Sequence, residues 1–187
     1  MSETLYLVAD IGATHARFQC CYMDAEKQPV WSSEALILPT QDYTNVDQLI
    51  ADVTAHWATV TFAAGLFAVA GPVDLRSGDV TVLNTGLRLP HKDLQTGFNC
   101  PVSCVNDFYA QAHAVPYITE YRTLLSKVQQ AQTVSDAVDQ PMALLGPGSG
   151  LGMATLIPEA NQHWRVLASE GGHADLAPGS FLEAELW

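Results

Sequence analysis

The segment from Asp10 to Arg17 is the first of three stretches in which glycine lies beside an acid or a hydroxyl at the end of a predicted strand. The sites of α/β proteins lie at such strand ends. Gly12 lets backbone N–H groups approach a phosphate, the Thr14 hydroxyl can donate a hydrogen bond, and the Asp10 carboxylate can orient a metal-bound water. No Gly-Lys-Ser/Thr sequence follows, so the spacing is not that of a Walker loop. A plain hairpin turn is the alternative.

The second stretch runs from Gly146 to Gly152 and contains four glycines in seven residues, directly after a predicted strand at 142–145. Successive free N–H groups in such a loop form a nest for an anion. The residues of interest in it are Gly146, Gly148, Ser149, Gly150 and Gly152. A flexible loop is the alternative. The chain has few Lys and Arg side chains, so backbone amides would have to bind any phosphate group.

The third stretch has two parts, Asn106 with Asp107 after one predicted strand and the segment Glu170 to His173 after another. Asp107 can accept a proton, whereas Asn106, Glu170 and His173 offer donors and acceptors suited to several hydroxyl groups. The alternatives are structural: Asp107 is then the N-cap of a helix at 108–114, and His173 is a hydrogen-bonded structural histidine.

A metal site is a further alternative for the same segment. Glu170, His173 and Asp175 could bind zinc in a hydrolase, but carboxylate-rich zinc sites without a second histidine or cysteine nearby are uncommon. We therefore predict no resident metal-ligating set.

The composition predicts a folded, soluble and acidic protein. Eight basic and 20 acidic residues give a formal net charge of -12, and 48% of the residues are apolar, which excludes disorder. The basic residues form no cluster that could neutralise phosphates, so neither nucleic acid nor an anionic membrane is an expected partner. The longest apolar run, Val60 to Val73, is shorter than the roughly 20 residues that span a bilayer.

The cysteines and the N-terminus indicate a cytoplasmic protein. Cys20 and Cys21 are adjacent, and Cys100 and Cys104 are four residues apart, which matches neither a disulfide framework nor the C-x-x-C spacing of zinc sites. No basic segment followed by an apolar one opens the chain, so no signal peptide is predicted. We expect reduced thiols.

The elements that must position these residues alternate between strand and helix. Strands are predicted at 5–9, 16–23, 31–38, 66–70, 80–83, 102–105, 142–145, 153–157 and 164–168, the first three as a meander and those at 66–70 and 142–145 as buried strands. Helices are predicted from Val46 to Trp57 after an N-cap at Asn45, at 92–96 and at 108–114. This order predicts a mixed α/β sheet.

We place a lobe boundary near residue 110, giving a small α/β lobe at 1–109 and the beginning of a larger α/β lobe at 110–187, with a polar connection at 129–140. Ser180 and Glu183 form a capping box for a final helix whose apolar residues are Phe181, Leu182, Leu186 and Trp187. The helix is cut off before its third turn. We therefore expect this chain to be the N-terminal part of a longer protein, and a homo-oligomer that hides these apolar residues by self-association.

Four patterns, taken in order along the chain, resemble the motifs of bacterial glucokinases. They are D-x-G-x-T-x-x-R from Asp10, N-D-F from Asn106, G-x-G-x-G-L-G from Gly146 and E-G-G-H-x-D-x-x-P from Glu170. Those enzymes are sugar kinases of the actin, hexokinase and chaperone ATPase superfamily. Each motif alone is weak evidence for the resemblance. Four motifs in the right order, spread over nearly all 187 residues, are strong evidence.

The resemblance implies a two-lobed kinase with a ribonuclease-H-like (actin-like ATPase) α/β fold, which closes on glucose and ATP. In that family the aspartate that matches Asp107 takes the proton of the sugar 6-hydroxyl. The residues that match Asn106, Glu170 and His173 hold sugar hydroxyls.

The same resemblance implies ATP and Mg²⁺ as cofactors. The loops that match Gly12 to Thr14 and Gly146 to Gly152 hold the ATP phosphates, and phosphoryl transfer depends on positioning and on charge compensation by Mg²⁺. Two positions depart from the family pattern: Ala13 stands where a second glycine is usual, and His15 stands where asparagine is usual.

The same resemblance limits what this chain is expected to do alone. A related zinc-bearing group usually carries clustered cysteines soon after the Glu-x-x-His element, and none follows His173 here, which favours glucokinase proper. A further sugar-binding glutamate and the glycine pair that holds adenosine lie, in the family, beyond Trp187, so we expect the 187-residue chain to be inactive as a kinase. The alternatives are a non-catalytic sugar-binding sensor on the same fold and a kinase for another hexose.

Overall fold

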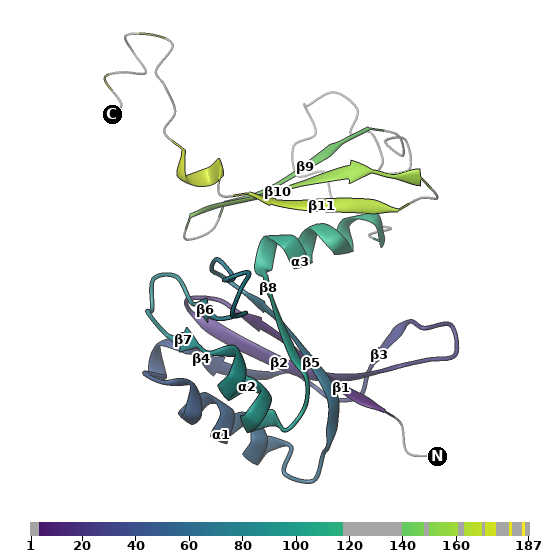
Figure 1. The fold of residues 1–187 in the computed structure, drawn as a ribbon, viewed down its shortest axis with the longest axis vertical. Helices are drawn as coiled ribbons and strands as arrows, with labels where there is room; N and C mark the ends of the chain where they lie inside the picture. The colour runs from purple at the N-terminus through teal and green to yellow at the C-terminus, as the bar shows by residue number, and fades with distance from the viewer. Residues whose placement is uncertain are drawn as a thin grey trace. The chain divides into compact units, whose positions relative to one another are not determined.

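The computed structural model describes residues 4–117, 140–147, 150–160, 163–169, 171–174, 180 and 185. The chain divides into two compact units, Met1–Gln111 and Ala112–Trp187 (Figure 1). Within the first unit a mixed sheet has the strand order β3-β2-β1-β5-β8, and β4 also pairs with β2. Its strands are β1 (Leu5–Ile11), β2 (His15–Met23), β3 (Pro29–Trp31), β4 (Leu36–Pro39), β5 (Phe62–Val69) and β8 (Val102–Asn106). The mixed α/β fold predicted from the sequence is confirmed.

The direction of the strands changes within this sheet. β1 and β2 form an antiparallel hairpin, and β3 and β4 each pair antiparallel with β2. β1, β5 and β8 run parallel to one another, joined by connections that contain helices. Parallel neighbours require such crossovers, so the helices of this unit are a consequence of the strand order.

Two helices pack together against the sheet, α1 (Val46–His56) and α2 (His91–Phe98) (Figure 1). α1 buries Val46, Leu49, Ile50 and Val53, which recur at helical spacing. As predicted, Asn45 is its N-cap, because the Asn45 Oδ1 atom accepts a hydrogen bond of 3.0 Å from the Gln48 N–H. The helices cover the face that carries Leu7, Ile11, Phe67 and Val69, all fully buried.

The centre of this core is aromatic. The Phe67 ring stands edge to face with Phe18 of the neighbouring hairpin, at 5.8 Å between centroids, and with Phe98 of α2, at 5.5 Å. Edge-to-face pairs add about 0.5–1.5 kcal/mol each to what area burial provides. These contacts tie β2, β5 and α2 into one cluster.

Two predictions for the first unit are wrong in detail. The predicted third strand at 31–38 is divided into β3 and β4, because the Ser33 Oγ atom accepts from the Cys20 N–H (3.2 Å) and the Ser33 carbonyl accepts from the Gln19 side chain (2.7 Å). Hydrogen bonds that involve side chains replace the backbone-to-backbone hydrogen bonds of paired strands at this point. β5 begins at Phe62 and is not buried on both faces, since Leu66 is 49% exposed.

Short elements complete the first unit. They are the 3-10 helix η1 (Thr40–Asp42), the hairpin of β6 (Val80–Thr81) and β7 (Arg88–Leu89), and the helix α3 (Asp107–Ala114), which begins in the first unit and is followed by η2 (Val115–Tyr117). No helix among the described residues is both long enough and apolar enough to cross a membrane.

The second unit contains a three-stranded antiparallel sheet in the order β11-β10-β9, built from β9 (Met142–Pro147), β10 (Leu151–Pro158) and β11 (Trp164–Ser169). The predicted turn at Gly146 to Gly152 is shorter than expected, because Gly146 pairs with Gly152 and Pro147 with Leu151. β9 is not the buried strand we predicted, since Leu145 is 56% exposed.

The 3-10 helix η5 (Gly171–His173) follows β11. The predicted connection at 129–140 and the predicted final helix lie outside the described residues, apart from Gln140, Ser180 and Glu185.

Candidate functional site

The carboxyl ends of β1, β5 and β8 lie at one edge of the first unit's sheet because the three strands are parallel. Ile11 is the register partner of Val69, and Val69 is the partner of Asn106. Neighbouring strands are about 4.8 Å apart, so Ile11 and Asn106 are separated by roughly 10 Å. The Gly12 loop and the Asn106-Asp107 pair, singled out separately in the sequence, therefore meet at this edge.

The loop from Gly12 to Thr14 turns tightly between β1 and β2. The Gly12 N–H donates to the His15 carbonyl at 2.9 Å. A Cβ atom at position 12 would lie 3.6 Å from the same oxygen, an ordinary contact, and the backbone of Gly12 is not in the left-handed region. The fold itself therefore does not require glycine at this position.

Asp10 lies on β1 directly opposite Arg17 on β2. The Arg17 Nη1 atom donates to the Asp10 Oδ2 atom at 3.2 Å, and the two side chains are 48% and 57% exposed, respectively. An exposed pair of this kind contributes at most about 1 kcal/mol to stability. The Asp10 carboxylate remains accessible to water at the sheet edge. One accessible carboxylate beside the Gly12 loop fits Mg²⁺, which keeps several waters and needs only one or two protein carboxylates.

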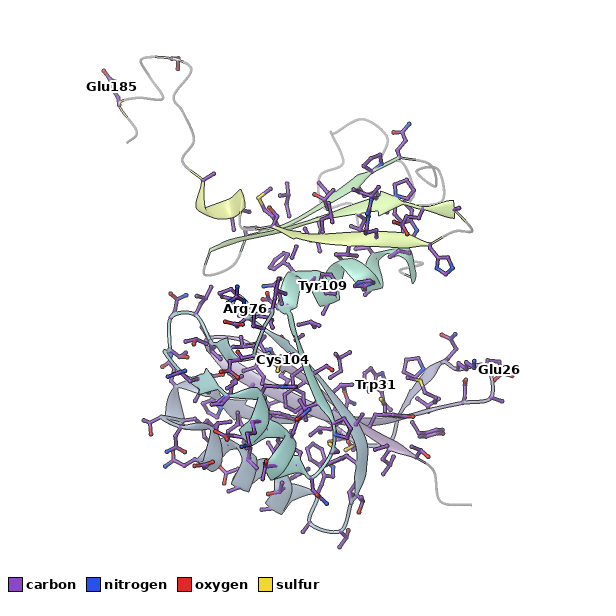
Figure 2. The ribbon with its side chains drawn as sticks, viewed as in Figure 1. Glu26, Trp31, Arg76, Cys104, Tyr109 and Glu185 are labelled. Carbon is purple, nitrogen blue, oxygen red and sulfur yellow. The ribbon has the colours of Figure 1, made fainter. Side chains whose placement is uncertain are left out.

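Asn106 connects two elements through its side-chain amide. Its Oδ1 atom accepts from the Tyr109 N–H at 3.1 Å, which caps α3, and its Nδ2 atom donates to the Gly71 carbonyl at 3.4 Å. Tyr109 is labelled on α3 in Figure 2. The sequence offered Asp107 as the N-cap of this helix, but α3 begins at Asp107 and the capping oxygen comes from Asn106.

Asp107 is the first residue of α3, immediately after β8. Its Oδ1 atom accepts from the Phe108 N–H at 2.9 Å. The half-buried carboxylate is thus placed at the carboxyl edge of the sheet by the strand that precedes it and by the helix that it starts.

A cavity of about 400 Å³ lies between the loop after β5 and the β6–β7 hairpin, with Asp74, Asp79 and Arg88 among its lining residues. No site residue predicted from the sequence lines it. Backbone N–H groups of Ser77 and Arg76 donate to the Asp74 carboxylate and lower its pKa. The Asp79 Oδ1 atom accepts from the His91 N–H at 2.9 Å, at the start of α2. Both acids thus hold the loop and the helix in place.

In the second unit the structure brings η5 against the start of β10. A Cβ atom at Gly172 would collide with the Leu151 carbonyl oxygen, and one at Gly171 would lie 3.0 Å from the Met153 sulfur. Gly172 is therefore needed for this close approach, whereas at Gly171 the neighbouring side chains would only have to shift by a few tenths of an ångström. The glycine-rich hairpin and the segment that ends at His173, far apart in the sequence, are neighbours within this unit.

Four predicted site residues cannot be placed in full. Gly148, Ser149 and Glu170 lie outside the described residues, and for His173 only the backbone in η5 is described. Asp175 of the alternative zinc set also lies outside them. The described residues contain no group of three or more His, Cys, Asp or Glu side chains placed to hold a metal ion.

The comparisons with known proteins identify the family of the chain. The family model for glucokinase matches residues 7–187. The chain belongs to the glucokinase family. It is 33% identical over 187 residues to a glucokinase of Marinobacter nauticus, covering 99% of this chain and 54% of that protein.

Two solved structures extend the comparison. A glucokinase from an Antarctic psychrotroph matches with a TM-score of 0.71 and 31% identity, over 99% of this chain and 56% of that one. A glucokinase of the ROK family from Streptomyces griseus, in complex with glucose and AMPPNP, matches with a TM-score of 0.59 and 19% identity, over 97% of this chain and 53% of that one, and is similar in fold. The chain spans about half the length of the curated relatives it matches.

One residue that contacts this site, Thr40, was not predicted from the sequence of this glucokinase-family chain. Thr40 is fully buried and hydrogen-bonds to the Gly12 loop across 28 residues of sequence. Its neighbours form a polar stretch between a strand and a helix, and no local pattern marks it. Only the tertiary contact reveals it.

Proposed function

We propose that the whole protein is a glucokinase that transfers the γ-phosphoryl group of ATP to the 6-hydroxyl of glucose. The observation that carries the proposal is the placement of the Gly12 loop and Asp107 two strands apart at one sheet edge, in a chain that belongs to the glucokinase family. A separation of roughly 10 Å suits a hydroxyl held by one strand end and a phosphate held by the other.

In this proposal Asp107 is the general base. It accepts the proton of the 6-hydroxyl as that oxygen attacks the γ-phosphorus, and the bond from phosphorus to the bridging oxygen of ADP breaks. Asn106, Glu170 and His173 bind the other sugar hydroxyls. Polar partners that bind a hydroxyl reject sugars that lack it, which gives selectivity for the hexose.

The phosphates are bound by backbone amides. The Gly12–Thr14 loop supplies the Ala13 N–H and the Thr14 hydroxyl, because the Gly12 N–H already donates to the His15 carbonyl. The turn between β9 and β10, within Gly146 to Gly152, supplies further N–H groups. The Asp10 carboxylate would hold Mg²⁺ through a bound water, and the ion would supply charge compensation. The related S. griseus enzyme, solved with glucose and AMPPNP, supports this choice of substrates. Gly12 supports it too, because the fold leaves that position free of any steric need for glycine.

We also propose that the protein acts in the cytoplasm as a homo-oligomer. All four cysteines are free thiols, and three of them are buried, as suits a reducing compartment. Sedimentation velocity of the whole protein tests the oligomeric state, and a purely monomeric species would contradict it.

The decisive test compares Asp107→Asn with Asp47→Asn in the whole protein. Both aspartates lie in the first turn of a helix, so each substitution removes a similar stabilisation by the helix dipole. We expect Asp107→Asn to lower kcat by at least about a thousandfold while calorimetric glucose affinity stays within about tenfold, because the base acts in the transition state. Asp47→Asn should change neither. Unchanged kcat in Asp107→Asn, or glucose binding without turnover by the wild type, would overturn the proposal, the latter in favour of a sugar sensor.

A further inference from the structure

Thr40 directs both of its hydrogen-bond donors at the Gly12 loop. Its side-chain Oγ1 atom donates to the Gly12 carbonyl at 2.7 Å, and its backbone N–H donates to the Thr14 carbonyl at 3.0 Å. Thr40 is the first residue of η1, directly after β4, and is fully buried. Among the described residues no other polar or charged residue is buried to this degree.

These two bonds determine which way the loop amides face. In a trans peptide the C=O and the following N–H point in opposite directions. Because the Gly12 carbonyl faces Thr40, the N–H of Ala13 faces away from it. In the part of the chain that is described, the Ala13 N–H has no hydrogen-bond partner, and Thr14 beside it is exposed. The Ala13 N–H is thus a free donor next to the exposed residue Thr14.

The loop needs this restraint because glycine is its first residue. Gly12 has no Cβ atom and rotates easily about its backbone bonds. A rotated Gly12–Ala13 peptide would present a carbonyl oxygen, which repels phosphate, where an N–H group now lies. The Thr40 hydroxyl stabilises the orientation that presents the N–H.

We propose that Thr40 is a positioning residue for nucleotide binding: it holds the Gly12 and Thr14 carbonyls inward so that the loop amides face the phosphates. This inference rests on the proposed function. Thr40 itself touches neither substrate, and its effect is on the nucleotide and not on the sugar.

The test uses the whole protein and three variants. Thr40→Val keeps the shape but removes the hydroxyl donor, and Thr40→Ser keeps the donor. Thr54→Val is the matched control, because the Thr54 hydroxyl also donates to a backbone carbonyl, that of Ile50 at 2.8 Å, within α1. Calorimetry measures the Kd of AMPPNP with Mg²⁺ and, separately, the Kd of glucose, and thermal unfolding gives Tm.

We expect Thr40→Val to raise the Kd of AMPPNP about tenfold or more while the Kd of glucose stays within twofold. Thr40→Ser should bind AMPPNP within threefold of wild type, and Thr54→Val should bind both ligands as wild type does. If Thr40→Val does not fold, Thr40→Ala removes the hydroxyl without a methyl group against the Gly12 carbonyl and has the same expected result.

Four outcomes would overturn the inference. AMPPNP affinity within twofold of wild type in Thr40→Val shows that the hydroxyl does not position the loop. Parallel losses of AMPPNP and glucose affinity together with a lower Tm, or failure of both variants to fold, assign Thr40 to the fold alone. If the wild type binds no AMPPNP, the proposed function itself fails, and the role of Thr40 toward phosphate fails with it.

Discussion

Gly97 on α2 and Ile50 on α1 meet so closely that a Cβ atom at position 97 would lie 2.6 Å from the Ile50 Cγ2 atom. Ile50 is β-branched and buried, so its side chain has little freedom to move aside within a helix. The absence of a side chain at position 97 therefore sets how closely the two helices pack, and these helices cover the sheet that carries Asp10 and whose strand β8 leads into Asp107.

Gly97→Ala is expected to destabilise the protein by about 1–2 kcal/mol, because overpacking costs more than the roughly 1 kcal/mol that alanine gains over glycine in a helix. In an Ile50→Ala background the same substitution should be stabilising, since the clash is gone and the helix preference remains. Urea unfolding of the two single variants and the double variant measures this. Additive effects would contradict the close contact.

How far the sequence predicts this fold depends on whether the signal is local. α1 was predicted because its buried residues repeat at helical spacing and Asn45 precedes them, and both signals come from residues only a few positions apart in the chain. The division between β3 and β4 was not predicted, because it depends on Ser33 bonding to Cys20 of another strand. The glycines at 146 and 152 favoured a turn, yet strand pairing places them opposite each other.

The candidate site shows the same difference between local signals, which can be predicted, and long-range contacts, which cannot. Asp10, Gly12 and Asp107 stand at predicted strand ends, and their common edge follows from parallel strands, so their neighbourhood was open to prediction. The roles of the supporting residues were not open to prediction. The capping of α3 by Asn106 needed the observed start of the helix, and the bonds of Thr40 to the Gly12 loop connect residues 28 apart.

Cys104 on β8, labelled in Figure 2, is expected to make stability depend on alkaline pH. Burial, and to a smaller degree the Asp79 carboxylate, raise the pKa of its thiol from 9.0 to about 11. The folded state therefore keeps a proton that the unfolded chain loses between about pH 9 and 11. The stability from the neutral thiol is complete below pH 9 and is lost as the pH rises toward 11.

The measurement is the free energy of unfolding of wild type and Cys104→Ala at pH 8 and pH 10.5. The alanine variant should lose less stability between the two pH values. The other groups with raised pKa values, Cys20, Cys21, Cys100 and Tyr43, are present in both proteins and cancel in the comparison. Equal losses would show that Cys104 titrates normally in the folded protein.

Substitutions of Asn106 should change both the free energy of unfolding and the affinity for glucose, through different atoms of its side chain. Asn106→Ala removes the cap of α3 and is expected to cost about 1 kcal/mol. Asn106→Asp keeps an acceptor at the helix N-terminus and should be less destabilising than Asn106→Ala. Under the proposed function both variants weaken glucose binding in the whole protein, because both lose the Nδ2 donor.

Asn45→Ala is the matched control for Asn106, because the Asn45 Oδ1 atom caps α1 with a bond of similar length, 3.0 Å to the Gln48 N–H against 3.1 Å for Asn106 to the Tyr109 N–H. It should cost about 1 kcal/mol of stability and leave glucose affinity unchanged. Urea unfolding and glucose calorimetry on the three variants give the comparison. Normal glucose affinity in Asn106→Ala would restrict Asn106 to capping.

Gly12 and Gly71 provide the sharpest separation of ligand binding from folding. A Cβ atom at Gly12 meets only the His15 carbonyl, at 3.6 Å, whereas a Cβ atom at Gly71 would collide with the Thr81 carbonyl oxygen. Gly12→Ala should therefore leave the free energy of unfolding within about 1 kcal/mol of wild type, while Gly71→Ala should lower it by about 2 kcal/mol or more.

Gly12→Ala should nevertheless raise the Kd of AMPPNP with Mg²⁺ at least about tenfold in the whole protein, because its methyl group takes space beside the amides that the phosphates approach. A large loss of stability in Gly12→Ala would mean that the fold requires this glycine. A stable Gly12→Ala variant with normal AMPPNP affinity would mean that the phosphates bind elsewhere.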